Sequence, residues 1–322
     1  MHARIEEFLE SMRGEGREST ARGYAHSLAV FEAWLQKRNL DLLMATFADL
    51  QAYQRFLADE YLTPANEHLN RSTQSTRLAA LKSFYQWLED RELVPESPAR
   101  LLKLPKVSRR TVNKDALDLQ EATALVQTQA GIVSGLKPGT LRWARQYRNL
   151  ALLCLALASG KRREIFRTLK VSDLDLKRHE LRVAHEKGRI GRVVPVAAWA
   201  VQICALYIAE ARQRLFRGRQ DAGFLFPGAM TDQLGGNVFM EFLKSLQIAA
   251  AAENLDLEGL QTKHLTPHVL RVSYATLLFS NGCNIRSINE LMNHSRLTTT
   301  AKYTPIPLED LRRVCRAAHP RA

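Results

Sequence analysis

The chain has 322 residues, of which 46% are hydrophobic and 25% are charged, and its formal net charge is +13. This length suggests two domains, each with a hydrophobic core, and the composition is that of a globular protein. No run of 18 apolar residues occurs and the charged N-terminus is not a signal peptide, so neither a membrane span nor a secreted protein is expected. The positive charge suits a polyanionic partner, although a generic basic protein would share it.

Residues 1 to about 108 are predicted to be almost entirely helical. Apolar residues recur at helical spacing in four segments, the first of which carries Ile5, Phe8 and Met12. The other three segments are predicted to begin at Ser19-Thr20, Thr46 and Ser72-Thr73. Their apolar stripes predict a small helical bundle.

Basic residues at the start of the fourth predicted helix stand among Ser, Thr and Gln. This mixture can bond DNA phosphates and base edges, but it is equally typical of a solvated helix face. The DNA-contact candidates here are Arg71, Arg77 and Lys82.

A basic segment of about residues 102–114 follows, and it is the predicted linker. It could lie along a phosphate backbone or be an ordinary tether. Its candidate DNA contacts are Lys106, Arg109 and Arg110. The expected domains are therefore residues 1–108 and residues 109–322, and the family resemblance described below implies that the first is a helical DNA-binding domain.

The second domain is predicted to be mostly helical with a small sheet. Two alternating segments separated by a glycine-bearing turn predict a pair of strands, Glu180–Ala184 and Arg192–Val196. Helices are expected over Asp118–Gln129, Thr140–Ser159, Trp199–Leu215 and Asn237–Ala252, with a short buried edge at Phe224–Pro227. The cysteines, which form no CxxC pair, are expected to be reduced and buried: Cys154, Cys204, Cys283 and Cys315.

The segment 265–304 concentrates polar residues of catalytic type. Thr266 and Pro267 are typical of a helix start, and His268 and Arg271 then fall on one helix face. A second helix is expected from Ile285 to about Asn293, directly before His294.

A break at Ser295-Arg296 is required if His294 and Tyr303 are to serve one site. In a continuous helix the two residues would lie about 13 Å apart along the axis. The break would lead into a short helix capped by Thr298 that presents Tyr303.

The order HVLR, MNH and Tyr303, nine residues after His294, resembles the C-terminal active-site box of the tyrosine recombinases, the phage-integrase family. Val272 and Asn293 depart from the family pattern, which often has a second histidine and a glycine at these places.

Two further segments resemble boxes of the same family. Ser159–Ile165 is similar to the first arginine box and makes Arg162 the catalytic arginine, with Arg163 as its competitor. Glu164 stands two residues after Arg162 instead of the family's three, which weakens any role for it. The turn in VAHEKGRIGRVVPV resembles the family's lysine motif and points to Lys187.

The resemblance implies a mainly α fold of the DNA breaking-rejoining type and a site-specific recombinase that needs no metal, cofactor or ATP. It implies that arginines clamp the phosphate, histidines donate to it, Tyr303 attacks it and Lys187 protonates the leaving oxygen. The implied catalytic residues are Arg162, Lys187, His268, Arg271, His294 and Tyr303. The implied partners are two double-stranded DNA sites bound by a cytoplasmic homotetramer, and a second recombinase or an accessory protein is left open.

An amphipathic helix is predicted over residues 307–317, with Leu308, Leu311, Val314 and Cys315 on one stripe. Pro305 and Pro307 break the chain between Tyr303 and this stripe, and we expect the helix to pack on a neighbouring subunit, with packing on its own domain as the alternative. The competing functions are a type IB topoisomerase, a DNA-binding relative without catalysis and, more remotely, a metal hydrolase using its two histidines. The biological role, whether phage integration, transposon or integron movement or dimer resolution, is left open by the residues.

Overall fold

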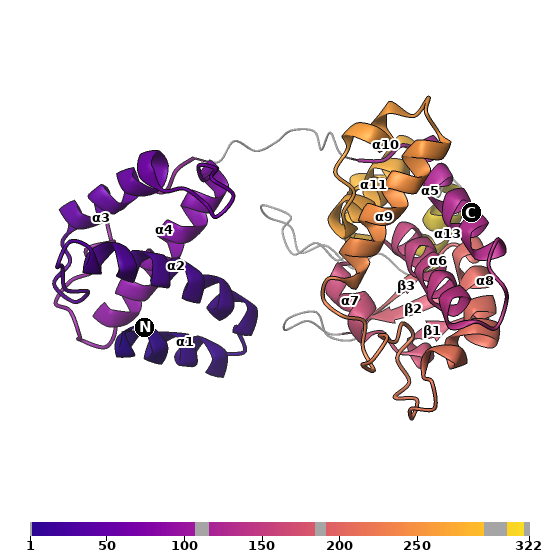
Figure 1. Cartoon of the computed structure of the whole chain (residues 1–322), viewed down its shortest axis with the longest axis horizontal. Helices are drawn as coiled ribbons and strands as arrows, with labels where there is room; N and C mark the ends of the chain where they lie inside the picture. The colour runs from indigo at the N-terminus through magenta and orange to yellow at the C-terminus, as the bar shows by residue number, and fades with distance from the viewer. Residues whose placement is uncertain (1, 107–115, 184–190, 293–307, 319–322) are drawn as a thin grey trace. The chain divides into compact units, whose positions relative to one another are not determined.

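The structure, a computed structural model, describes residues 2–106, 116–183, 191–292 and 308–318 (Figure 1). The chain forms two compact units, Met1–Thr111 and Val112–Ala322, and each is described by itself. The predicted class, mainly helical with a small sheet, is confirmed.

Unit 1 is a helical bundle in the indigo-to-violet part of Figure 1. Its helices are α1 (Ala3–Gly14), α2 (Glu18–Gln36), α3 (Phe47–Arg55) and α4 (Arg71–Glu89), and a π-helical turn, Phe56–Glu60, extends α3. Aromatic rings fill the core: Phe31 and Tyr53 meet edge to face at 4.8 Å. The hydroxyl of buried Tyr85 donates to the Leu42 carbonyl at 2.9 Å and so ties the loop after α2 to α4.

Two of the predicted helix starts in unit 1 are wrong by one or two residues. Helix α4 is capped by Asn70, whose side-chain oxygen accepts from the Thr73 amide at 2.9 Å. Helix α2 begins at Glu18 after Arg17, with no side-chain cap. The helix start at Thr46 is as predicted, and a capping box forms there, because the side chains of Thr46 and Asp49 each accept from the other's backbone amide.

Unit 2 is built around α6 (Leu141–Ser159), in which every residue from Arg148 to Ser159 is buried. Helices α5 (Leu119–Ser134), α8 (Ala198–Leu206) and α11 (Pro267–Ser280) pack against α6. The remaining helices are α7 (Arg163–Thr168), α9 (Val238–Glu253), α10 (Glu258–Thr262), α12 (Ile285–Met292) and α13 (Leu308–Ala318), with a 3-10 turn at Val171–Asp173. No helix in the described part of the chain has both the length and the apolar character that crossing a bilayer requires.

The described strands form one antiparallel sheet in the order β1 (Leu174–Asp175), β2 (Glu180–Val183) and β3 (Arg192–Pro195). Leu181 pairs with Leu174 on one side and with Val194 on the other. The β2–β3 pair was predicted, but β1 was not, because two residues are too few for an alternating pattern. The segment at Phe224 forms a single bridge with Lys170 rather than a strand.

The predicted helix Trp199–Leu215 is confirmed over its whole length, but only its first part is an α-helix. After α8 the chain forms a π-helical turn, Tyr207–Ala211, and a 3-10 turn, Arg212–Leu215. In the 3-10 turn the Arg212 guanidinium pairs with Asp221 at 2.5 Å and donates to the Phe224 carbonyl at 2.6 Å. These bonds join the end of the helical segment to the following loop.

Helix α13 packs on its own chain, against β3, α11 and α12. Cys315 and Ala318 are buried there, and Arg312 forms an ion pair with Glu180 of β2. Packing of this helix on a neighbouring subunit stays a prediction. No disulfide joins the four cysteines, all of which lie in the described ranges and are buried.

Candidate active site

The centre of the site is the turn at the end of α6. Gly160 ends that helix with a left-handed backbone, φ 58°. A Cβ at this position would overlap the ring of Tyr274, which is itself 2% exposed. Gly160 therefore allows the turn and the close approach of α11, and it places Lys161 and Arg162 directly beyond the buried helix.

Arg271 joins this turn to two other elements. Its guanidinium, on α11, donates to the Gly160 carbonyl at 2.7 Å and to the Met292 carbonyl at 2.6 Å. The Arg271 side chain is 4% exposed, so these bonds are shielded from water. Gly160 and Arg271, which are 111 positions apart in the sequence, thus lie in one cluster with the end of α12.

Helix α11 begins as predicted: Pro267 is at its first position and the Thr266 hydroxyl accepts from the Val269 amide at 3.1 Å. His268 is exposed and lies one turn before Arg271. The same helix therefore offers an imidazole to solvent and a guanidinium to the buried cluster.

Arg162 and Arg163 differ in their surroundings. Arg162 is exposed and precedes α7 with an extended backbone, φ −71° and ψ 151°. Arg163 pairs with Glu164 at 2.9 Å, and Arg167 pairs with the same carboxylate at 2.7 Å. Desolvation raises the pKa of Glu164, but hydrogen bonds from Arg167 and Arg163 outweigh it and hold that pKa below its usual value. The Glu164 carboxylate thus binds both Arg163 and Arg167.

Of the six predicted catalytic residues, three lie outside the described residues: Lys187, His294 and Tyr303. The structure fixes the elements before and after them. Strands β2 and β3 flank the segment that contains Lys187, and α12 ends at Met292, two residues before His294.

The predicted DNA contacts in unit 1 also differ in their surroundings. Arg71 and Lys106 are exposed. Arg77 is 6% exposed, lies over the ring of Tyr61 at 4.4 Å and is 3.3 Å from the His26 ring nitrogen. A DNA contact by Arg77 would require its side chain to leave this position.

Lys82 is held by the segment that leads to the linker. Its Nζ donates to the carbonyls of Arg100 and Leu102 at 3.1 and 3.0 Å. A phosphate would compete with these two carbonyls for the ammonium group. Arg109 and Arg110 lie outside the described residues.

Lys161 is a residue of the site that the sequence patterns did not single out. It is 3% exposed, and its Nζ donates to the Leu291 carbonyl at 2.8 Å. The one available signal was a lysine directly after the glycine that ends a wholly apolar helix segment. That signal does not identify a partner 130 residues away.

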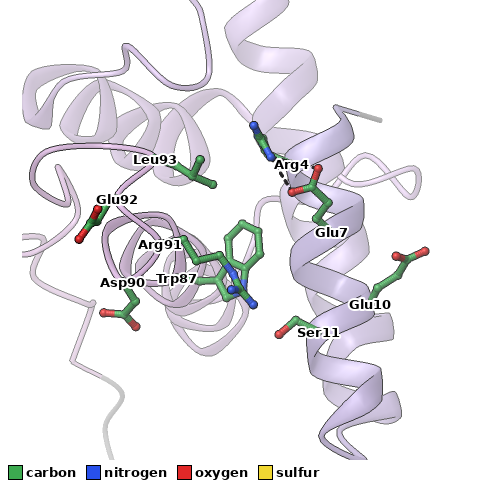
Figure 2. A pocket seen from close by; sticks show the side chains of 9 residues that line it. All are labelled: Arg4, Glu7, Glu10, Ser11, Trp87, Asp90, Arg91, Glu92 and Leu93. Carbon is green, nitrogen blue, oxygen red and sulfur yellow. Dashed lines mark hydrogen bonds and ion pairs between the residues drawn. The ribbon is translucent and has the colours of Figure 1, made fainter.

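A cavity of about 870 Å³ in unit 1 lies between α1 and the end of α4 (Figure 2). Its charged lining residues are the carboxylates of Glu7, Glu10, Asp90 and Glu92 and the guanidiniums of Arg4 and Arg91. Arg4 pairs with Glu7, and Arg91 lies over the ring of Trp87 at 4.6 Å. Its excess of carboxylates is unsuited to a DNA phosphate, and none of the predicted DNA contacts lines it.

Metal ligation has no support in the described ranges, where no group of three or more His, Cys, Asp or Glu side chains could hold an ion. Among the residues that the structure describes, His268 belongs to no such group.

Comparison with known proteins adds a relationship over the whole chain. The profile of the Phage integrase family matches residues 141–307, and that of the Phage integrase, N-terminal SAM-like domain, matches residues 5–92. The tyrosine recombinase XerC of Myxococcus xanthus is 33% identical over 322 residues, covering 99% of this chain and 98% of the relative. The tyrosine recombinase XerD of Yersinia pestis is 32% identical over 321 residues, covering 99% and 97%.

Solved structures share the fold. The XerH site-specific recombinase bound to its difH substrate has a TM-score of 0.67 at 16% identity, covering 96% of this chain and 81% of that one. The Tn1549 transposon integrase in complex with circular intermediate DNA has a TM-score of 0.59 at 17% identity, covering 92% and 93%.

Proposed function

Because the chain belongs to the phage integrase family, we propose that it is a site-specific DNA recombinase that cuts and rejoins DNA through a covalent bond to Tyr303. As a member of this family it is a tyrosine recombinase, and its relatives include proteins named XerC and XerD. The covalent 3′-phosphotyrosine and the residue roles below are the parts that we infer.

The observation that carries the proposal is the contact of Arg271 with the turn of Gly160. The resemblance assigns a phosphate-binding arginine to each of two distant sequence boxes. A single phosphoryl group can meet both arginines only if the two boxes fold together, and this hydrogen bond of 2.7 Å joins them.

The roles follow from the chemistry of phosphoryl transfer. The transition state gathers negative charge on the nonbridging oxygens, which guanidinium groups of Arg162 and Arg271 can clamp. His268 and His294 add donors to the same group. A cationic site lowers the cost of forming the Tyr303 phenolate, whose ordinary pKa is about 10.

The attack by Tyr303 forms a phosphotyrosine and releases a 5′-oxygen, which receives a proton from Lys187. The phosphodiester energy is retained in the new bond, so a 5′-hydroxyl of another strand can attack it and restore Tyr303. Because the bond energy is conserved in this way, the reaction requires no ATP.

The DNA partner is supported by the neighbours with DNA in their structures, such as XerH bound to difH. We further propose that a homotetramer holds two DNA sites, and that it works in the cytoplasm, where its DNA substrate would lie. The roles of Arg71 and Lys106 as phosphate contacts belong to the same proposal.

The test is adduct formation on a duplex that the protein selects from a random-sequence pool and that is then nicked to trap the cut strand. Wild-type protein should yield a protein–DNA adduct on a denaturing gel. Tyr303→Phe should bind the duplex equally well and yield none, because only the hydroxyl is lost. An adduct that survives in Tyr303→Phe would remove Tyr303 as the nucleophile.

A further inference from the structure

Lys161 is a buried cation that lies among the proposed catalytic residues but is not one of them. We propose that Lys161 is a positioning residue for DNA cleavage. It holds the end of α12 against the turn that carries Arg162. In the sequence, the segment that contains His294 follows this end of α12. This inference rests on the proposed function, in which both of these residues meet the phosphate.

The end of α12 is held at two consecutive carbonyl groups. Lys161 donates to the Leu291 carbonyl at 2.8 Å, and Arg271 donates to the Met292 carbonyl at 2.6 Å. The last carbonyls of a helix lack intrahelical donors and carry partial negative charge, so two cations stabilise this end. Since the cations come from different elements, the turn after α6 and α11, the helix end is fixed relative to both.

The bonds from Lys161 and Arg271 to the end of α12, here called the clamp, are part of a packed cluster. Arg271 also donates to the Gly160 carbonyl, directly before Lys161, so the two cations are linked through one peptide unit. Leu291 and Met292 are 1% and 2% exposed. Movement of the helix end would therefore disturb both the hydrogen bonds and the packing.

The clamp lies next to proposed catalytic residues in the sequence. Arg162 follows Lys161 directly in the sequence. The segment that contains His294 follows Met292 in the sequence. The bonds of Lys161 and Arg271 to the end of α12 thus fix the turn of Arg162 relative to Arg271, and the proposed function places both arginines on the phosphate.

The family resemblance assigns a phosphate contact to Arg271 but none to Lys161. The ammonium group is directed to the Leu291 carbonyl, and the side chain is 3% exposed. Loss of Lys161 should therefore slow the chemical step without weakening DNA binding. Small misplacements of reacting groups have large effects on rate, on the order of 100-fold for 1 Å.

The test is Lys161→Met, which keeps most of the apolar side chain, one heavy atom shorter, and removes its charge and donors. At saturating amounts of the selected nicked duplex, we expect single-turnover adduct formation to slow about 10- to 100-fold. The dissociation constant for the intact duplex should stay within about 2-fold of wild type, as for a site that does not touch the DNA. Amide hydrogen exchange at the end of α12 should become faster.

Arg148→Met is the matched control, because Arg148 is also a buried cation of the α6 region, 5% exposed, and donates to the Pro227 carbonyl at 2.8 Å. It should lower stability without changing the adduct rate of the folded protein or exchange in α12. If Lys161→Met does not fold, Lys161→Gln, which retains an N–H donor, is tested by the same measurements with the same expected direction.

Three results would overturn the inference: a wild-type adduct rate in the variant, unchanged exchange in α12, or a loss of DNA affinity as large as the loss of rate. Failure of the wild-type protein to form any adduct would instead overturn the proposed function.

Discussion

Arg162 and Arg163 are adjacent in the sequence, and Arg163 forms an ion pair with Glu164. The spacing after Gly160, which resembles the family's arginine box, makes Arg162 the catalytic candidate. Arg162→Ala should therefore reduce adduct formation by about 100- to 1,000-fold, the loss typical of one transition-state donor. Arg163→Ala should retain most of the activity. Single-turnover rates on the selected nicked duplex measure both, and the reverse order of effects would assign the catalytic role to Arg163.

Gly160 provides a second prediction at the level of one residue. Gly160→Ala places a methyl group against Tyr274 at a φ of 58°, so both steric overlap and backbone strain oppose it. We expect unfolding free energy to fall by about 2 to 4 kcal/mol, together with slower adduct formation.

The matched control is Gly139→Ala, since Gly139 has a φ of 79° with no atom within 4 Å of the added group. It should cost only the strain, about 1 kcal/mol. Urea denaturation compares the two variants, and equal losses would mean that contact with Tyr274 is unimportant.

Residue types and short spacings pointed to the candidate residues, but they did not predict the burial and contacts of each side chain. The spacing of His268 and Arg271 predicted a shared helix face, but the structure exposes the first and buries the second. Arg77 likewise looked like a phosphate contact and lies in the bundle with Tyr61. Such differences in burial depend on packing between segments that are distant in the sequence, and so does the bond from Lys161 to Leu291. Local sequence patterns carry no information on this packing.

At the level of elements, long amphipathic segments were predictable and their ends were less so. Helix α6 is recognisable from its apolar run and the glycine that follows it. The segment Trp199–Leu215 is helical as predicted, but the spacing of its apolar residues does not show where the α-helix gives way to the π-helical and 3-10 turns.

The prediction at the level of elements concerns helix α13. Deletion of residues 308–322 should leave binding to a single DNA site intact, because none of the proposed phosphate ligands lies in this segment. If this helix links subunits in the assembly, joining of two sites should be lost. Gel shifts with one duplex and a joining assay with two measure these effects.

Arg313→Ala is the control, since this side chain is exposed on the same helix and should retain joining. Loss of the apolar contact between α13 and α11 is expected to lower thermal stability, so both assays are run well below the melting temperature of the deletion. Normal joining by the truncated protein would exclude the intersubunit role.

At the level of the whole molecule, the charge of +13 predicts binding that depends strongly on salt. Each neutralised phosphate should contribute roughly −0.9 to the slope of log K against log salt concentration. Contacts by Arg71, Lys106 and the basic linker would together give a slope of about −3 or steeper. Titrations from low to physiological salt measure it, and a nearly flat dependence would contradict extensive phosphate contacts.

The central claim, that the chain cuts DNA through Tyr303, is tested most directly by locating the covalent bond. Protein trapped on the selected nicked duplex is digested with nuclease and protease, and the peptides are sequenced by mass spectrometry. We predict a nucleotide linked through its 3′-phosphate to Tyr303. A nucleotide linked to any other residue, or a hydrolysed DNA strand with no attached peptide, would contradict the account.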